Sequence, residues 1–372
     1  MRNQTAAILL SRQPLRPTGQ TAWVKQTVQA VRWIKQQGFT LCTSIGMQTW
    51  ELLTSLASLE EIEQTMFVPA RSNDEFEQWK KFAHEQFSLK PGVVNFILVL
   101  SDTNATKEQL WLKRDHAITR AADFLVPVSV RKGGHMAALI RQLGAEGKKI
   151  EGRFQTTHEK RTEPLAYNIQ TNYLNPELLE IKDQYVIHWT RASNSAWPTE
   201  RLIDYYRAII ESETYPRSAF HTLTNIISTK RICASPKHMP LSIPTVSFSG
   251  LPPVEVIPLM KWRSRYQQMS FEPYGIGFKK DNAIGADIHP VRYFQRGNER
   301  INDKEPWLWQ SLGEKGDWRA EREYRHKGDL DFSQIPAHRM CAFCCTKREA
   351  QIIEESTGIR AVSFLHGDKP SF

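Results

Sequence analysis

The sequence predicts a two-domain α/β protein, in which a domain built on a mostly parallel sheet precedes a mixed α+β domain. The chain has 372 residues and a mass of 43.0 kDa, more than a single core usually serves. Residues 1–155 alternate short β-rich runs with helical patterns, which is typical of strand–helix–strand units. In the later part helices come first and strands follow. With 40% hydrophobic and 24% charged residues, the composition excludes a disordered chain.

The first half has the pattern of a Rossmann-like domain over residues 1–155. Several of its expected strands are continuously apolar, as strands covered on both faces are. Between the first two, Val24, Val28, Val31 and Ile34 share one face of a helix expected over residues 22–37, and Gly38 ends it. The expected strands are 6–10, 39–43, 65–68, 93–100 and 124–130, with 149–154 as an edge strand.

A polar stretch over residues 156–183 is predicted to be a linker, and residues 184–372 to form the second domain. Helices are expected over 198–211, with an apolar stripe of Leu202, Tyr205, Tyr206 and Ile209, and over 219–228. Strands are expected at 184–189, 245–249, 274–278, 291–294, 321–326 and 339–345.

The composition also limits the cellular setting. No apolar run approaches the roughly 18 residues of a membrane span, and residues 6–10 are too short a run for a secretory segment. Three of the five cysteines lie at 341, 344 and 345. A structural zinc site needs four ligands. We therefore interpret these three cysteines as buried reduced thiols and expect no metal. The sequence predicts a cytoplasmic protein without a membrane partner, and it does not indicate an oligomeric state.

The formal net charge is +9, and residues 1–155 hold 20 Lys and Arg against 14 Asp and Glu. A basic excess suits a phosphate-bearing ligand, either a nucleotide or a nucleic acid, although solvated surfaces also carry one. In an open α/β sheet, ligands bind beyond the carboxyl ends of the strands, where helix N-termini offer N–H groups and a positive dipole.

Two segments of the first half qualify as phosphate-binding loops. Residues 43–49 follow a strand and precede a helix, and Ser44, Gly46 and Thr49 would let the backbone approach a phosphate. Helix N-capping explains Ser and Thr there about as well.

The second segment, residues 128–135, joins Arg131 and Lys132 to the double-glycine turn Gly133–Gly134. Upstream, Arg114 begins a helical pattern and could hold a phosphate with two hydrogen bonds. The alternative for Arg114 is a solvated surface charge.

The order of strand, residues 43–49, Arg114–Asp115 and residues 128–134 resembles the Rossmann-like SLOG superfamily, which includes the DNA-processing protein A and the cytokinin-activating phosphoribohydrolase families. The resemblance covers nearly all of residues 1–155. It implies binding of nucleotides, nucleotide-derived signals or single-stranded DNA. Some members cleave N-glycosidic bonds, but here nucleotide sensing is the expected role.

The second domain holds the candidates for catalysis. As a strand, residues 185–190 place His188 and Thr190 on one face, although a solitary histidine of this kind is more often structural. Ser247 and Ser249 share a face of another strand, and Tyr274 lies among glycines. Tyr274 could stack on a planar ring or simply begin a strand.

Residues 318–325 alternate carboxylates with arginines. As a strand they place Arg319, Glu321, Glu323 and Arg325 on one face. Such a face is usually only solvated, yet arginines keep neighbouring carboxylates charged at neutral pH. A charged carboxylate could orient a ribose hydroxyl and stabilise an oxocarbenium-like centre.

The second domain resembles the ADP-ribosyltransferase superfamily, closest to DarT-like toxins, over about 160 residues. The resemblance rests on His188 and Thr190, on Ser247 and Ser249, and on the late glutamates Glu321 and Glu323. The resemblance implies NAD as substrate, held by His188 and Thr190, in a pocket lined by Ser247 and Ser249 with Tyr274 stacked on nicotinamide. Glu323, or Glu321 two residues earlier, would be the catalytic glutamate, assisted by His188.

The sequence therefore predicts an NAD-consuming ADP-ribosyltransferase-like effector of a toxin or antiviral defence system, with a nucleotide-sensing first domain. The alternative is a non-catalytic protein that binds single-stranded nucleic acid. Residues 261–266 interleave cations with aromatic rings, which suits nucleic acid. An amphipathic helix would explain that segment equally well.

Overall fold

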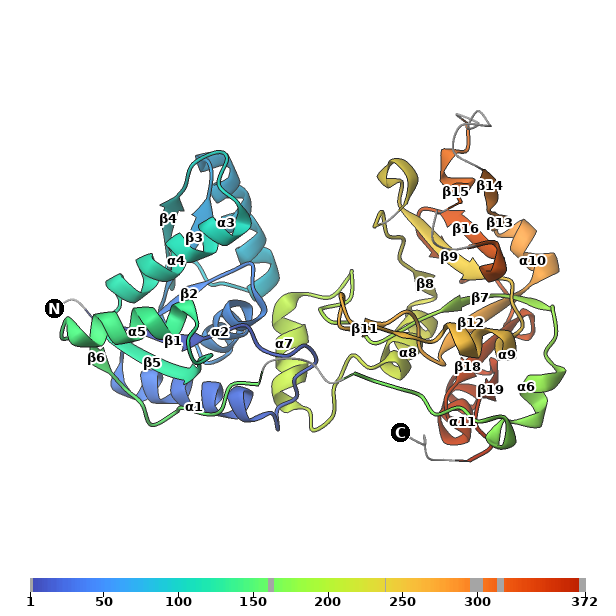
Figure 1. Cartoon of the computed structure of the whole chain (residues 1–372), viewed down its shortest axis with the longest axis horizontal. Helices are drawn as coiled ribbons and strands as arrows, with labels where there is room; N and C mark the ends of the chain where they lie inside the picture. The colour runs from blue at the N-terminus through green and yellow to red at the C-terminus, as the bar shows by residue number, and fades with distance from the viewer. Residues whose placement is uncertain (1–2, 160–163, 238, 295–303, 313–317, 368–372) are drawn as a thin grey trace. The chain divides into compact units, whose positions relative to one another are not determined.

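The computed structural model describes residues 3–159, 164–237, 239–294, 304–312 and 318–367 (Figure 1). It divides into two compact units. Unit 1 comprises residues 1–162 and 194–216, and unit 2 comprises residues 163–193 and 217–372. The chain therefore passes between the units three times. Residues 160–163 of the predicted linker lie outside the described residues.

Unit 1 is built on a six-stranded parallel sheet with the Rossmann-like order β4-β3-β2-β1-β5-β6 (Figure 1). From β1 the chain builds the sheet outward in one direction as far as β4, and it then returns to the other side of β1 for β5. This reversal creates a switch point between β1 and β5. The strands are β1 (Thr5–Leu10), β2 (Thr40–Ser44), β3 (Gln64–Ala70), β4 (Val94–Leu100), β5 (Phe124–Ser129) and β6 (Lys149–Ile150).

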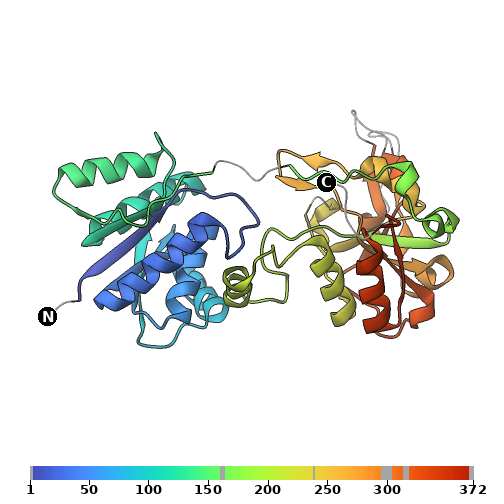
Figure 2. The same cartoon turned by 90° about the horizontal axis from the view of Figure 1, so that it is seen from below.

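Helices cover both faces of this sheet, and Figure 2 shows α1 and α5 on opposite sides of it. The helix expected over residues 22–37 forms as α1, and it ends at Gly38, whose φ is 67°. That left-handed conformation favours glycine. The helices of the sheet domain are α1 (Ala22–Gln37), α2 (Gln48–Leu59), α3 (Asn73–Phe87), α4 (Lys107–Ala121) and α5 (His135–Ala145).

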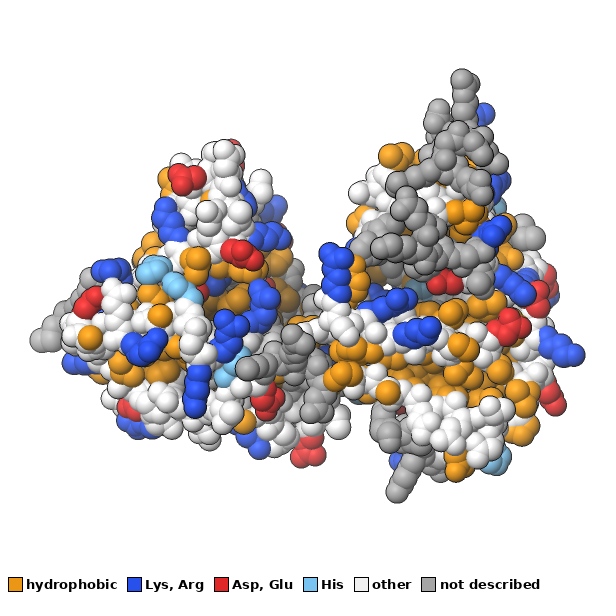
Figure 3. Space-filling view, in the orientation of Figure 1, with side chains coloured by type: hydrophobic (Ala, Val, Ile, Leu, Met, Phe, Trp, Pro, Cys, Tyr) orange, Lys and Arg blue, Asp and Glu red, His pale blue; other side chains and the backbone are white. Residues whose placement is uncertain are grey.

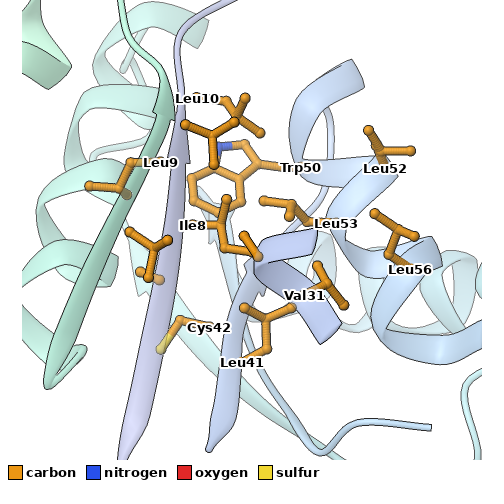
Figure 4. Close-up of a cluster of buried hydrophobic side chains, with 14 of the residues drawn as sticks. Ile8, Leu9, Leu10, Val31, Leu41, Cys42, Trp50, Leu52, Leu53 and Leu56 are labelled. Atoms are coloured by element: carbon orange, nitrogen blue, oxygen red, sulfur yellow. The ribbon is translucent and has the colours of Figure 1, made fainter. Parts of the chain in front are cut away.

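The core of unit 1 surrounds β1. Ile8 and Leu10 pack with Val31 of α1 and Trp50 of α2, and Leu9 points to the other face of the sheet, all of them buried (Figure 4). Burying one such aliphatic side chain stabilises a fold by roughly 1.5–3 kcal/mol. Because β1 is covered on both faces, its carboxyl end has a fixed position from which loops can present a site.

The helix expected over 198–211 forms as α7 (Leu202–Glu211), but it packs in unit 1 rather than in the second domain. Tyr205, Tyr206 and Ile209 of the predicted stripe are buried there. The second domain therefore does not run unbroken from 184 to 372. The predicted linker is partly structured as well, since α6 (Pro176–Glu180) belongs to unit 2.

Unit 2 contains a seven-stranded mixed sheet of order β13-β16-β9-β7-β12-β18-β19, in which β18 and β19 are parallel. Its strands are β7 (Tyr185–Trp189), β9 (Thr245–Ser249), β12 (Gly275–Lys279), β13 (His289–Pro290), β16 (Glu323–Lys327), β18 (Met340–Cys344) and β19 (Arg360–Ser363). Its longer helices are α8 (Ala219–Thr229) and α11 (Lys347–Thr357).

Shorter elements complete unit 2. Two short helices are α9 (Pro253–Val256) and α10 (Lys280–Gly285). Three pairs of short strands are β8 (Arg231–Ile232) with β17 (Leu330–Asp331), β10 (Trp262–Arg263) with β11 (Gln268–Met269), and β14 (Arg292–Phe294) with β15 (Trp309–Ser311). The segment 261–266 thus belongs to a hairpin, and the helix alternative for it is wrong.

The strand expected over 321–326 begins later than expected. Residues Trp318–Glu321 form a 3₁₀ turn, and β16 begins at Glu323. Arg322 between them has a φ of 45°, which an extended strand does not allow. Arg319 and Glu321 therefore do not continue the strand face of Glu323 and Arg325.

Two other expectations concern cysteines and membranes. Cys341, Cys344 and Cys345 are fully buried free thiols, as predicted, and burial raises the pKa of Cys341 and of Cys345 to about 12. Within the parts of the chain that the structure describes, no helix has the length and apolar character needed to cross a bilayer.

Candidate functional site

A pocket of about 930 Å³ lies beside the carboxyl end of β5, in unit 1. We name it the β5–α5 pocket. It is lined by Pro127, Val128 and Val130, by Arg131 and Lys132, by Ala137, Ile140 and Arg141 of α5, and by Gln155, Thr156, Thr157 and His158. Pockets of this size hold small molecules.

The turn between β5 and α5 shapes the mouth of the pocket. The N–H of Gly134 donates to the carbonyl of Arg131 at 3.1 Å, and Gly133 has a φ of 71°. A Cβ on Gly134 would lie 3.2 Å from that same carbonyl oxygen. The turn thus uses both glycines. Gly134 is also the N-cap of α5 and supplies no side-chain cap, so the first N–H groups of α5 keep their donor capacity and positive dipole.

The lining of the pocket is basic and contains no carboxylate. Arg131, Lys132 and Arg141 are exposed, and among the described residues no acidic side chain forms an ion pair with them. Figure 3 shows Lys and Arg side chains on this face of unit 1. Val128, Val130 and Ile140 supply apolar surface next to the cations. The pocket therefore combines an anion-attracting mouth with an apolar wall.

Gln13, which follows β1, joins the switch point to the pocket. Its Nε2 donates to the carbonyl oxygens of Ser11 and Ser129 at 2.9 and 3.0 Å, and it lies 3.3 Å from Nδ1 of His158. The N–H of Arg131 donates to Oγ of Ser11 at 2.9 Å. These bonds fix the pocket wall and the basic turn to the ends of both central strands.

At the first predicted loop, residues 43–49, side chains of the protein take the place expected for a ligand. Ser44 is fully buried and donates to the carbonyl of Phe67 at 2.7 Å, and Thr49 is 1% exposed. The carboxylate of Glu51 accepts hydrogen bonds from the N–H of Gly46 and from the hydroxyl of Tyr206. Glu51 therefore fills the place at the start of α2 where a phosphate was expected, and burial raises its pKa.

Both predictions for Arg114, a phosphate ligand and a solvated surface charge, are wrong, because its side chain is fully buried. Its Nε and Nη2 donate to Oδ1 of Asp115 at 3.0 and 2.9 Å, and its guanidinium lies over the Trp50 ring, 5.4 Å from the centroid. Burial lowers the pKa of Arg114, while Asp115 raises it. This arginine holds α4 against α2 and is not available to a ligand.

In unit 2 the structure brings together four of the predicted residues. Oγ of Ser247 donates to Oε1 of Glu323 at 2.9 Å, and Oγ of Ser249 donates to the carbonyl of Glu321 at 3.1 Å. Arg325, 2% exposed, donates from Nε and Nη2 to the two carboxylate oxygens of Glu323 at 2.8 and 3.0 Å.

The two glutamates have different environments. The bidentate contact with Arg325 compensates the charge of Glu323. Burial raises the pKa of Glu321, the negative charge of Glu323 raises it further, and Arg263 lowers it. Two neighbouring carboxylates in unlike environments are able to take different roles in acid–base chemistry.

His188 lies on the opposite face of the sheet from these groups, which corrects its predicted role. The pairing of Ile187 with Ser249 places those two side chains on one face, and successive residues of a strand alternate between faces. The His188 ring accordingly contacts Phe248 at 5.8 Å, and its Nδ1 lies 2.9 Å from the carbonyl oxygen of Ser247. Burial lowers the pKa of His188.

Thr190 and Tyr274 are buried as well, at 7% exposure each. The hydroxyl of Tyr274 donates to Oε1 of Glu349 at 2.9 Å, and burial raises its pKa far above the ordinary value. Glu349 in turn closes the capping box of α11 with Thr346. Tyr274 is therefore a core residue and does not form a stacking platform for nicotinamide.

Sequence reasoning missed three residues of the β5–α5 pocket region. Arg141 follows Ala137 by four positions on α5, so helical spacing from the glycine turn could have found it. Gln13 and His158 had no such signal, because their meeting depends on the adjacency of β1 and β5 and on the return of the chain after β6.

No protein-family model matches this chain, and no curated protein matches its sequence. The fold and the sites therefore define its class by themselves. It is a two-unit α/β protein, in which a Rossmann-like unit carries a basic pocket at the carboxyl end of a central strand and a second unit carries a Ser–Glu–Arg cluster on a mixed sheet.

Proposed function

We propose that unit 1 binds a phosphate-bearing ligand of the nucleotide class in the β5–α5 pocket. The observation that carries this proposal is the coincidence, in one pocket, of Arg131, Lys132 and Arg141 with Ala137 of the first turn of α5 and with no acidic lining residue. A helix N-terminus with adjacent cations is a general solution for holding phosphate.

The two kinds of lining surface suit the two parts of a nucleotide. The phosphate would accept hydrogen bonds from the first N–H groups of α5 and from Arg131, which also supplies charge. The base or ribose would lie on Val128, Val130 and Ile140. Such a ligand would contact residues 155–158, the segment that precedes the passage into unit 2, which supports a sensing role.

Calorimetric titration of the full chain with ATP tests this proposal. Binding by the wild type and at least tenfold weaker binding by the Arg131→Ala, Lys132→Ala double variant are expected, because the pocket lining loses two of its Lys and Arg side chains. Lys25→Ala, which removes an exposed cation from α1, is the matched control and keeps full affinity. Equal affinities for all three proteins, or the absence of binding, would contradict the proposal.

A second function, cleavage of the nicotinamide–ribose bond of NAD, is favoured by the hydrogen bond from Ser247 to Glu323. This bond and Arg325 fix a charged carboxylate on one face of the sheet. The proposal keeps Glu321, Glu323, Ser247 and Ser249 and leaves out His188, Thr190 and Tyr274.

In this reaction a carboxylate of the pair accepts a hydrogen bond from a ribose hydroxyl and stabilises the positive charge that develops at the anomeric carbon. The bond to nicotinamide breaks with its electron pair leaving on the ring nitrogen. Water or a macromolecular nucleophile then forms the new bond to the anomeric carbon and loses a proton. The two hydrogen bonds from Arg325 hold the Glu323 carboxylate in place.

Release of nicotinamide from NAD, measured with and without candidate nucleic-acid acceptors, tests the second function. Turnover that disappears in the Glu321→Gln, Glu323→Gln double variant supports it. Unchanged turnover in that variant would remove the assignment. Salt-dependent retention of single-stranded DNA without any NAD turnover would favour the non-catalytic nucleic-acid-binding alternative.

A further inference from the structure

Strand β4 is the outer strand of the unit 1 sheet, and it lacks the features that usually protect such an edge. Asn95 is its one polar residue, and the strand contains neither a charged residue nor a proline. Most of its side chains are partly exposed, and Leu100 is 53% exposed. Exposed apolar edge strands of this length are templates for pairing with another chain.

The opposite edge of the sheet is built differently. β6 has only two residues, and one of them is Lys149. Short edge strands and lysines are the usual means of preventing association. One edge of the sheet is therefore protected and the other is open.

The backbone of β4 has a free row of hydrogen-bonding groups. The N–H of Gln64 donates to the carbonyl of Val93, and the N–H of Ser101 donates to the carbonyl of Ala70, so the odd-numbered residues of this stretch face β3. Backbone groups alternate in direction along a strand. The N–H and C=O groups that point outward are therefore those of Val94, Phe96, Leu98 and Leu100, and among the described residues nothing pairs with them.

This row is complementary to itself. In an antiparallel arrangement with a two-fold axis at Ile97, Val94 pairs with Leu100 of a second copy and Phe96 pairs with Leu98. Every outward-pointing group of the strand then has a partner, and the apolar side chains of these residues meet across the junction.

The charges that flank the strand fit the same arrangement. Lys90, which also pairs with Glu61 on the surface, precedes β4, and Asp102 follows it; both are exposed. The two-fold axis brings Lys90 of each copy toward Asp102 of the other, at both ends of the junction. A parallel arrangement would instead place like charges together.

We infer that unit 1 associates with a second copy of this chain through β4, forming one continuous sheet across a two-fold axis. The junction is isologous, so association stops at the dimer. This inference does not depend on what the β5–α5 pocket binds.

Sedimentation analysis of the full chain and of edge variants tests the inference. The wild type is expected to be a dimer. Leu98→Pro removes only an outward-pointing N–H, so the β3–β4 ladder is kept while association weakens at least tenfold. Leu98→Lys adds a charge at the same place and has the same effect. Ile150→Lys, at the 43% exposed residue of β6, is the matched control and stays dimeric. A monomeric wild type, or a dimer that Leu98→Lys and Leu98→Pro leave unchanged, would overturn the inference.

Cross-linking locates the axis. Ile97 faces itself across the junction as a non-hydrogen-bonded pair, whose Cα atoms are about 4.5 Å apart, within the range that a disulfide spans. In a Cys233→Ser background, Ile97→Cys should give a covalent dimer under mild oxidation. Asn95→Cys, which lies roughly 13 Å from its own copy in this register, should not. Equal cross-linking of both variants, or of neither, would overturn the β4 arrangement.

Discussion

The hydroxyl of Tyr206 in α7 donates a 2.9 Å hydrogen bond to the carboxylate of Glu51 in α2. Glu51 also accepts the N–H of Gly46, so the chain supplies its own anion to the start of α2. Segment 194–216 thereby becomes part of unit 1, and the phosphate expected at residues 43–49 has no place there. Of the two loops that could hold phosphate, the turn before α5 is the one with an open pocket.

The Glu51–Tyr206 pair predicts a dependence of stability on pH. Burial raises the pKa of Glu51 in the folded state, so the folded chain holds this proton more tightly than the unfolded chain does. As pH rises from the ordinary carboxyl pKa, about 4.3, through the raised folded value, Glu51 therefore lowers the free energy of unfolding. In Glu51→Gln this loss is absent, and the variant gains stability relative to wild type as the pH rises to neutrality. Urea unfolding at pH 4 to 7 measures the difference, and a trend of opposite sign would contradict the assignment.

Removal of the Tyr206 hydroxyl should destabilise unit 1. Tyr206→Phe leaves the buried Glu51 carboxylate short of a donor, which costs about 1–3 kcal/mol. Tyr173→Phe is the control, because Tyr173 is 54% exposed and its substitution should be nearly neutral. Thermal unfolding compares the two variants, and equal effects would show that the buried hydrogen bond contributes nothing.

Two glycines separate backbone strain from ligand binding. Gly133 and Gly147 both have positive φ, at 71° and 88°, and neither would bring a Cβ within 4 Å of another group. Gly133→Ala and Gly147→Ala should therefore each cost about 1 kcal/mol of stability. Only Gly133→Ala should weaken nucleotide binding, because Gly133 belongs to the turn at the pocket. Similar losses of affinity in both variants would place the ligand elsewhere.

The bidentate contact between Arg325 and Glu323 should be important for the stability of unit 2. Arg325→Met leaves the carboxylate of Glu323 without its cation, and removal of one partner of a buried pair costs about 3–5 kcal/mol. The Glu323→Gln, Arg325→Met double variant removes both charges and should recover much of that loss. Denaturant unfolding of the single and double variants measures the coupling, and additive losses would mean that the pair is not coupled.

The position of His188 predicts a difference between unit 2 variants in any turnover of NAD. His188 lies on the Phe248 face of the sheet, away from Glu323, so His188→Gln should keep nicotinamide release within about twofold of wild type wherever it stays folded. Circular dichroism checks the folding. A hundredfold loss in a folded His188→Gln protein would show that the histidine reaches the cofactor after all.

The strands and helices of unit 1 could be predicted from sequence because each depends on local patterns. The apolar period and Gly38 define α1, and the glycine turn after a buried strand identified Arg131 and Gly133. The placement of α7 could not be predicted in this way, since an amphipathic helix does not specify which unit buries its apolar face.

The candidate site of unit 2 was less predictable for a similar reason. The two-residue period of a strand shows which of its side chains share a face, but not which face of the next strand lies beside them. The sequence therefore placed His188 and Ser247 in one site, whereas the pairing of β7 with β9 puts them on opposite faces of the sheet. The positive φ of Arg322 likewise separates Glu321 from the face of Glu323, and arginine gives no local signal of that conformation.

Hydrogen–deuterium exchange of the full chain with and without ATP tests the central claim most directly, because it reports where the ligand is held. The account predicts slower exchange in residues 131–141 and 155–158, with little change in residues 44–51. Protection confined to residues 44–51, or found in unit 2 alone, would contradict the assignment of the β5–α5 pocket.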